Sequence, residues 1–284
     1  MANYISHMAN FIPLSRSTEY LTVPGGRIAY DIQGDGPLLL LLPGMGELRS
    51  SYRHLVPLLV AAGFTVATAD LRGHGDSSAD FTAYGDVATA SDIAALVRHL
   101  GAPAAVVGNS MSAGSAVVAA AEHPELFDSL VLVGPFVRNP VNSSVFKRLM
   151  FRVLMARPWA RTMWNAYLPT LYSGAKPDDF PAYRTSMITA MKRPGYTQAF
   201  RLTTRTDHAP AERALPAVQA PTLVVMGEQD PDFADPAAEA AWIAEALNGS
   251  VAMIADAGHY PQSQQPEATA RAIIQFLGSG QPDA

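Results

Sequence analysis

The chain has 284 residues, of which 49% are hydrophobic, a formal net charge of −5 and no cysteine. The lack of cysteine excludes disulfides, thiol catalysis and thiolate metal sites, and no apolar run reaches the roughly 18 residues of a transmembrane helix. The overall acidity and the absence of a recognised binding module argue against nucleic acid as a partner. We therefore expect a cytoplasmic protein with a large apolar core and no membrane contact.

Strand and helix patterns alternate along the chain. Apolar runs predict strands at residues 19–23, 27–32, 38–42, 64–69, 104–107, 130–133, 222–226 and 251–255. Amphipathic periodicity predicts helices at residues 52–62, 87–100, 110–122, 237–247 and 266–277. From the third strand onward the strands are short and wholly apolar, which is typical of a parallel sheet buried on both faces. The fold class predicted is α/β: a mostly parallel eight-stranded sheet with helices on both faces.

A serine stands where one of these strands turns into a small-residue helix. Ser110 follows the strand at 104–107, and Gly108, two residues before it, suits a tight turn. A serine hydroxyl is a weak nucleophile at neutral pH, so it needs an imidazole to take its proton and a carboxylate to orient that imidazole. Asp230 and His259 follow in that order, each just after another predicted strand, so the three side chains can meet at one edge of the sheet.

Four segments resemble loops of the α/β-hydrolase family, and the resemblance runs from about residue 19 to residue 277 except across the middle. The segments are the oxyanion loop at 42–46, the Asp-x-Arg-Gly-x-Gly-x-Ser loop at 70–77, the acid loop at 227–230 and the histidine loop at 257–260. The resemblance implies an α/β-hydrolase fold with an inserted helical cap. It also implies that Ser110 is the nucleophile, His259 the base and Asp230 the acid.

The resemblance further implies an oxyanion hole formed by the backbone N–H groups of Met45 and Met111. Two residues depart from the family pattern. Pro43 replaces the usual histidine of the oxyanion loop, and Ser112 replaces the second glycine of Gly-x-Ser-x-Gly. We expect Pro43 to change the support of its loop, and Ser112 to make the helix pack a slightly larger side chain against the neighbouring strand.

Other titratable residues are weaker candidates. Asp232 could take the place of Asp230, but the family motif favours Asp230 and leaves Asp232 as a loop residue. His74 is expected to hold its own loop. The remaining histidines are isolated and lack metal-ligand spacing: His7, His54, His99, His123 and His208. We therefore predict no metal and no cofactor.

The charge is unevenly distributed. Residues 136–215 contain thirteen lysines and arginines against four acidic residues, whereas the rest of the chain contains seven against twenty-one. The resemblance assigns this basic interval to the cap. The predicted organisation is therefore a first core part at 16–135, a cap at 136–215 and a second core part at 216–278.

Three interpretations of the basic cap remain open. The arginines can lie on exposed helix faces and pair with the acidic body. A cap arginine such as Arg193 can bind an anionic substrate. Residues 145–155 can form a basic amphipathic helix that contacts a membrane or an acidic partner.

The function expected is hydrolysis of a small carboxylic ester or lactone, with the small-molecule substrate as the partner. An alternative comes from Asn109, because an asparagine before the serine resembles carbon–carbon hydrolases of ring-cleavage products, whose substrates carry a carboxylate. Tyr260 stands where that group often has tryptophan. Asn109 and Tyr260 are also candidate substrate contacts. A second alternative is a small-molecule receptor with slow turnover.

Overall fold

The computed structural model describes residues 18–140, 150, 153–156 and 158–278. At its centre is an eight-stranded sheet with the strand order β1-β2-β4-β3-β5-β6-β7-β8. The strands are β1 (Glu19–Val23), β2 (Gly26–Gln33), β3 (Leu38–Leu42), β4 (Thr65–Ala69), β5 (Ala104–Asn109), β6 (Phe127–Val133), β7 (Thr222–Gly227) and β8 (Ser250–Ile254). β2 pairs antiparallel with β1 and β4, and the other pairs are parallel. The predicted fold class is confirmed.

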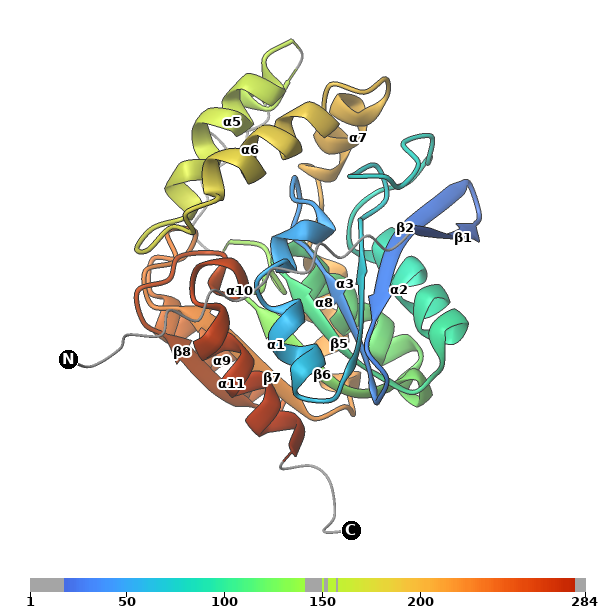
Figure 1. Cartoon of the computed structure of the whole chain (residues 1–284), viewed down its shortest axis with the longest axis vertical. Coiled ribbons are helices and arrows are strands. Elements are labelled where there is room, and N and C mark those ends of the chain that lie inside the picture. Colours follow the sequence, from blue (N-terminus) through green and yellow to red (C-terminus); the bar gives the residue numbers. More distant parts are fainter. Residues whose placement is uncertain (1–17, 141–149, 151–152, 157, 279–284) are drawn as a thin grey trace, which may run out of the picture.

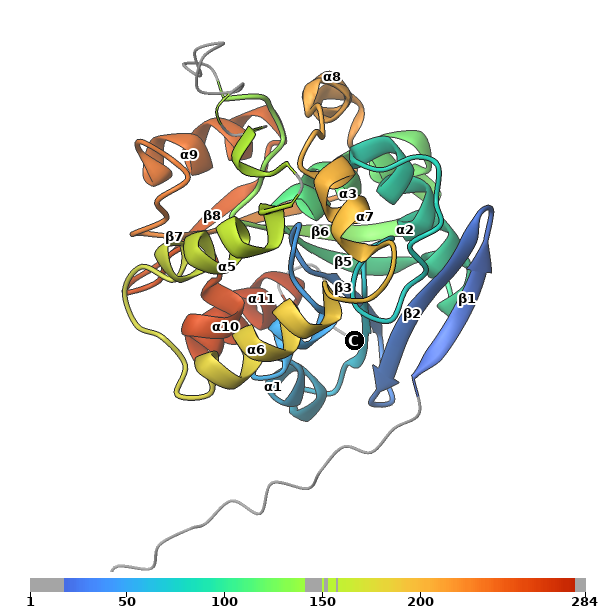
Figure 2. The same cartoon turned by 90° about the horizontal axis from the view of Figure 1, so that it is seen from above.

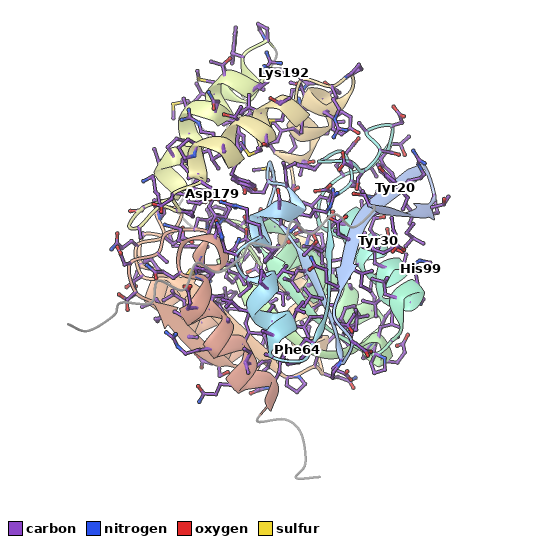
Figure 3. All side chains as sticks on the ribbon, viewed as in Figure 1. Tyr20, Tyr30, Phe64, His99, Asp179 and Lys192 are labelled. Atoms are coloured by element: carbon purple, nitrogen blue, oxygen red, sulfur yellow. The ribbon has the colours of Figure 1, made fainter. Side chains whose placement is uncertain are left out.

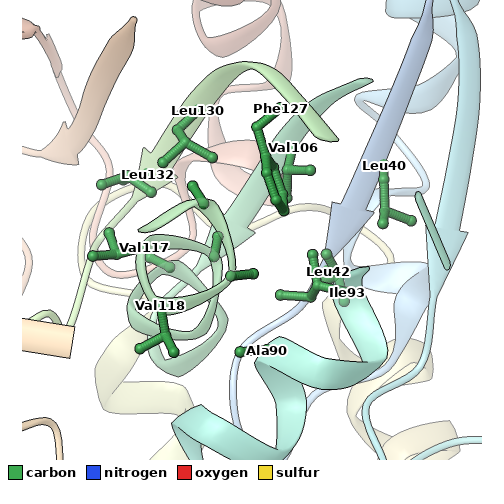
Figure 4. Close-up of a cluster of buried hydrophobic side chains, with 14 of the residues drawn as sticks. Leu40, Leu42, Ala90, Ile93, Val106, Val117, Val118, Phe127, Leu130 and Leu132 are labelled. Carbon is green, nitrogen blue, oxygen red and sulfur yellow. The ribbon is translucent and has the colours of Figure 1, made fainter. Parts of the chain in front are cut away.

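Helices cover both faces of this sheet because its central strands are apolar on both sides. Leu40 and Leu41 are neighbours in β3 and point to opposite faces, so they belong to separate core clusters. The Leu40 cluster, drawn in Figure 4, includes side chains of α2 (Asp86–Leu100), α3 (Met111–Glu122) and α9 (Pro236–Ala246). The Leu41 cluster includes side chains of α1 (Val56–Ala61) and α11 (Pro266–Gly278).

The helix predicted at residues 52–62 is shorter in the structure. Arg49–Tyr52 forms a 3₁₀ turn (η1), and α1 begins only at Val56, with Pro57 in its first turn. Proline lacks the N–H group that an inner turn would use, so it is tolerated at the start of a helix and not inside it. The other predicted strands and helices agree with the observed bounds to within three residues.

Several helices and a 3₁₀ turn lie among the described residues between β6 and β7. They are α5 (Ala160–Leu171), α6 (Phe180–Ala190), α7 (Tyr196–Thr203) and α8 (Ala209–Ala214), followed by η3 (Leu215–Ala217). We call α5, α6 and α7 the overlying helices, because Figures 1 and 2 show them above one edge of the sheet. Their apolar faces meet around Trp164, Met187 and Phe200, and this cluster extends to Tyr260 of the main body.

Polar contacts fasten the overlying helices to the main body. Arg53 Nε donates a hydrogen bond to Asp179 Oδ2 at 2.6 Å, and Asp179 lies just before α6 on the side that faces the main body (Figure 3). That hydrogen bond lowers the pKa of Asp179 to about 2. Trp164 Nε1 of α5 donates to the carbonyl oxygen of Gly46 at 3.3 Å. Both contacts reach the segment that follows β3.

A short helix, α10 (Pro261–Gln264), precedes α11, and η2 (Pro124–Leu126) joins α3 to β6. No helix among the described residues has the length and hydrophobicity needed to cross a bilayer. Most of the stretch 145–155, for which the sequence suggested a basic amphipathic helix, lies outside the described residues.

Candidate active site

Ser110 lies at the turn between β5 and α3 in a backbone conformation that few residues other than glycine adopt. Its φ and ψ angles are 58° and −121°, and strain of this kind costs about 1–3 kcal/mol. The turn is tight, because a Cβ on Gly108 would lie 2.6 Å from the carbonyl oxygen of Ser112. Glycine at position 108 therefore lets α3 start close behind β5, with the Ser110 side chain on the wall of a cavity.

His259 and Asp230 are in contact just beyond the ends of two neighbouring strands. Asp230 follows β7 and His259 follows β8. His259 Nδ1 donates a hydrogen bond to Asp230 Oδ2 at 2.7 Å, and both side chains are buried. Since an ionised carboxylate can only accept, this contact keeps a proton on Nδ1 and leaves Nε2 able to receive one.

Ser110 and His259 line the same cavity. Within the described part of the chain, Ser110 Oγ forms no hydrogen bond, so the Ser110–His259 contact is not closed in this state. Such contacts are often long before a substrate is bound. The structure therefore brings the three predicted residues to one site, with Asp230 and His259 hydrogen-bonded and Ser110 facing the same space.

Asp232 lies on the other side of the His259 ring. Its Oδ2 is 3.7 Å from His259 Nε2, and its Oδ1 accepts a hydrogen bond from Tyr167 at 2.7 Å. Burial by itself lowers the pKa of His259, but the Asp230 and Asp232 carboxylates outweigh burial and raise it to about 9. The sequence left Asp232 as the weaker candidate for the acid, and in the structure it lies beside His259 without bonding to Nδ1.

Asp230, Asp232 and His259 are also the described residues whose arrangement could hold a metal ion. One ligand atom from each lies within 4.8 Å of the others. A metal ion at this position would compete with the hydrogen bond between Asp230 and His259. Metal coordination and proton acceptance both require a lone pair on an imidazole nitrogen.

The N–H group of Met45 lies in the loop after β3, and that of Met111 lies directly after Ser110. Met111 is the first residue of α3, whose N–H has no partner within the helix. The loop with Met45 approaches closely, because a Cβ on Gly44 would lie 2.9 Å from the Cβ of Ser110. Neither N–H donates a hydrogen bond to another group in the described ranges, and Met45 lines the cavity beside Ser110.

The two residues that depart from the family motifs, Pro43 and Ser112, are in contact. The Ser112 hydroxyl lies 2.8 Å from the carbonyl oxygens of Leu42 and Pro43, so it ties α3 to the end of β3. The Gly46 N–H donates to His74 Nε2 at 3.0 Å. Burial lowers the pKa of His74, which keeps the imidazole neutral and able to accept. His74 thus supports the loop after β3 as well as its own.

The cavity beside Ser110 has a volume of about 590 Å³. Its wall is mostly apolar and aromatic, as is common for small-molecule sites. The lining side chains of this kind include Met45, Phe136, Trp164, Tyr167, Leu171 and Tyr260, and the polar ones include Asn139, Thr204, Arg205, Thr206, His208 and Asp232. Of the overlying helices, α5 contributes part of this wall, so a molecule bound there would lie between α5 and Ser110.

Residues 39–272 match the family described as "Alpha/beta hydrolase family". The chain belongs to the α/β-hydrolase family. BpoC of Mycobacterium tuberculosis, provisionally named a non-heme bromoperoxidase, is 33% identical over 268 residues, which cover 89% of this chain and 98% of BpoC. The 2-(acetamidomethylene)succinate hydrolase of Mesorhizobium japonicum is 29% identical over 269 residues, covering 89% and 92%. The crystal structure of a bromoperoxidase from Bacillus anthracis has a TM-score of 0.80 at 20% identity, covering 92% and 100%, a likeness in fold alone.

The three predicted substrate contacts of this α/β hydrolase lie in different places. Tyr260 lines the cavity, with its ring centroid 5.0 Å from that of His259. Asn109 is buried, and its Nδ2 donates to the carbonyl oxygens of Val133 and His259 at 3.0 and 3.2 Å. Asn109 therefore braces the loops that carry Ser110 and His259, which is a structural role.

Arg193 lies outside the Ser110 cavity of the hydrolase. It lines a second cavity of about 530 Å³, where its Nη1 is 3.3 Å from Asp76 Oδ1 and its guanidinium lies over the ring of Tyr196. Instead, Arg205 and His208 line the Ser110 cavity. Neither residue stood out in the sequence, because both belong to a loop whose position depends on the packing of α7 and α8.

The hydrolase also buries a carboxylate near the site. Glu47, in the loop after β3, is fully buried, and its Oε2 accepts a hydrogen bond from Tyr183 of α6. Its Oε1 has no partner among the described residues. Burial raises the pKa of Glu47 to about 7, although the hydrogen bond from Tyr183 and the charge of Arg53 act in the opposite direction. The sequence signal that could have revealed this buried carboxylate is that Glu47 is the single charged residue in the apolar, glycine-rich segment 42–48.

We expect Glu47→Gln to stabilise the fold more at about pH 8 than at about pH 5. The carboxyl ionises near 4.5 in the unfolded chain and near 7 in the folded protein, so the parent loses stability as the pH rises between these values. A shift of this size corresponds to at most about 3 kcal/mol. Thermal unfolding at both pH values measures the effect. An equal change in Tm at the two pH values would contradict it.

Proposed function

We propose that this protein is a serine hydrolase that cleaves small carboxylic esters or lactones through an acyl-enzyme. The observation that carries the proposal is that Ser110, in its strained turn, faces the cavity in which Asp230 orients His259. An oriented imidazole beside an accessible serine is the arrangement that nucleophilic acyl transfer requires. Membership of the α/β-hydrolase family supports the same reaction class.

In the acylation step, Ser110 Oγ attacks the carbonyl carbon of the substrate while its proton passes to His259 Nε2. The negative charge that forms on the carbonyl oxygen is stabilised by the N–H groups of Met45 and Met111. The tetrahedral intermediate collapses when its bond to the leaving oxygen breaks, and the imidazolium gives its proton to that oxygen. The Asp230 carboxylate stabilises the imidazolium throughout.

In the deacylation step, His259 Nε2 takes a proton from water, and the resulting hydroxide attacks the acyl carbon. The bond to Ser110 Oγ breaks, and Oγ recovers its proton from the imidazolium. The products are the free acid and the regenerated serine. Hydrogen peroxide in place of water would give a peracid by the same steps, and the provisional name of BpoC, non-heme bromoperoxidase, makes this side reaction worth measuring.

Residues 136–215 serve in this proposal as a cap over the reaction site, between core parts at 16–135 and 216–278. The overlying helices carry Trp164, Tyr167 and Leu171 to the cavity wall. Apolar side chains at this position exclude water from the acyl chain and strengthen the polar interactions at the carbonyl group.

The alternative is hydrolysis of a carbon–carbon bond in a vinylogous diketo acid. The residue that favoured this alternative in the sequence is Asn109. In the structure its Nδ2 donates hydrogen bonds to two backbone carbonyl oxygens beside the site. A second alternative is a receptor that binds a small molecule and turns it over slowly. Both alternatives use the same cavity as the proposed ester hydrolase, so the compounds that the protein cleaves or binds distinguish the three functions.

The proposal is tested by assaying the purified protein with alkyl esters of graded chain length, lactones and a vinylogous dienoate. Turnover of an ester or lactone near the roughly 10 per second of typical enzymes is expected, together with labelling of Ser110 by a fluorophosphonate. Cleavage of the dienoate alone would favour the carbon–carbon hydrolase. Tight binding with less than about one turnover per minute would favour the receptor, and failure to label Ser110 would overturn the nucleophile.

A further inference from the structure

One wall of the Ser110 cavity is built by the loop between α7 and α8. Thr206 Oγ1 donates to the carbonyl oxygen of Thr203 at 2.7 Å and lies 3.4 Å from the sulfur of Met111. The His208 N–H donates to Asn139 Oδ1 at 3.2 Å, which ties the loop to the segment after β6. These contacts hold the loop against the start of α3, and therefore beside Ser110.

Arg205, in this loop, presents an unpaired positive charge to the cavity. Among the lysines and arginines of the described residues, it is the one that lines the Ser110 cavity. Its side chain is exposed and forms no hydrogen bond or ion pair within the described ranges. By contrast, Arg138 is paired with Glu239 and Arg193 with Asp76. A planar guanidinium with all its N–H groups free is suited to bind a carboxylate through two parallel hydrogen bonds.

His208 adds a second group to the same wall. Its Nδ1 donates to the buried Asp86 Oδ2 at 2.8 Å, and its ring stacks on Phe136 with centroids 5.7 Å apart. Asp86 thus keeps a proton on Nδ1 and fixes the plane of the ring. His208 Nε2 has no partner among the described residues, so a protonated His208 can donate a hydrogen bond from Nε2 into the cavity.

Groups of opposite charge line the cavity. Asp232 lies beside His259 and repels an anionic group there, whereas Arg205 lies three residues from His208 in the loop between α7 and α8. An anionic substrate would therefore place its carboxylate at the Arg205 wall. Its uncharged part would lie on the apolar wall near Trp164 and Leu171.

We propose that Arg205 and His208 form a carboxylate-binding subsite, and that the substrates are esters or lactones that carry a carboxylate. This inference rests on the proposed hydrolase function. It assigns specificity to Arg205 through direct contact with the carboxylate. His208, held by Asp86, donates the second contact and positions the carboxylate against the guanidinium.

The test compares monoethyl esters of succinate, glutarate and adipate, each beside the uncharged isostere in which an amide replaces the free carboxylate. We expect at least one acid to be hydrolysed with at least about tenfold higher kcat/KM than its amide. Arg205→Gln should remove that preference mainly through KM and leave the amides within about twofold. His208→Asn, which can still donate to Asp86, should show a smaller loss on the acids alone.

Arg213→Gln is the matched control, because Arg213 is an exposed arginine of α8 outside the cavity lining. It should change neither substrate class. Equal hydrolysis of acids and amides by the parent, or equal losses on both classes in Arg205→Gln, would overturn the subsite while leaving the ester hydrolase intact. Hydrolysis of no ester of either class would count against the proposed function itself.

Binding measured without turnover separates the two proposals. In Ser110→Ala, the acid that the parent prefers should bind at least about tenfold more tightly than its amide in a calorimetric titration. The double variant with Arg205→Gln should lose that difference. Raising the salt concentration should weaken binding of the acid and leave the amide unchanged. An acid that binds no better than its amide in Ser110→Ala would refute the subsite whatever the activity assays give.

Discussion

Replacing Ser110 by alanine is expected to lower kcat/KM for the best ester substrate by about 10⁴-fold or more. The variant removes the oxygen that attacks the carbonyl group, and a serine hydrolase without its nucleophile keeps only the catalysis due to binding and to the oxyanion hole. Steady-state hydrolysis of one ester by parent and variant measures the loss. Fluorophosphonate labelling should disappear at the same time.

The fold should survive this substitution. Alanine keeps a Cβ at the strained position, and Ser110 Oγ forms no hydrogen bond within the described part of the chain. Circular dichroism and Tm should therefore stay close to those of the parent. Ser186→Ala is the matched control, because Ser186 is exposed on α6 and bonds only to the carbonyl oxygen of Ala182. Comparable activity in Ser110→Ala and Ser186→Ala would rule out Ser110 as the nucleophile.

Asp230→Asn is expected to lower kcat by about 10⁴-fold, because an amide at this position no longer holds the correct tautomer of His259. Asp232→Asn should keep activity within about tenfold of the parent, since Asp232 lies 3.7 Å from Nε2 and does not bond to Nδ1. The pair of variants distinguishes the two acids that the sequence left in competition. A larger loss in Asp232→Asn than in Asp230→Asn would reverse the assignment.

The pH profile gives this comparison a second readout. The base must be neutral to accept the Ser110 proton, so kcat/KM rises with pH through the pKa of His259, which the Asp230 and Asp232 carboxylates raise to about 9 despite burial. Removing the Asp232 charge should move the rising limb to lower pH. A limb that stays in place in Asp232→Asn would show that this carboxylate does not act on the imidazole.

The sheet was predictable because its signals are local. The wholly apolar run of β3, with Leu40 and Leu41 on opposite faces, can be stable only between two layers of helices. The start of α1 was predicted incorrectly, although Pro57 was visible, because Tyr52 and Leu55 extend the apolar periodicity of the helix back to the last residue of the 3₁₀ turn. Periodicity reports which side chains are apolar, and it does not report which hydrogen-bonding pattern the backbone uses.

Positions at the site were predictable where a strand end determines them. Ser110, Asp230 and His259 each follow a strand of a parallel sheet, and the carboxyl ends of parallel strands meet at one edge. The sequence named Asp232 only as an alternative acid and gave no sign that it lies on the Nε2 side of His259. The contact of Glu47 with Tyr183 was not predictable, because it joins the loop after β3 to α6, which is far away in the sequence.

The amino-acid order alone determined the layered α/β architecture and the arrival of a hydroxyl, an imidazole and a carboxylate at one edge, because chain direction and hydrophobic pattern are properties of short segments. Only the tertiary structure decided which basic groups face the cavity. Arg193 and Arg205 lie twelve residues apart in the same basic interval, yet one pairs with Asp76 outside the cavity and the other lines it. The physical reason is that the orientation of a surface arginine depends on how α6, α7 and α8 pack on the body, and that packing leaves no periodic trace in the sequence.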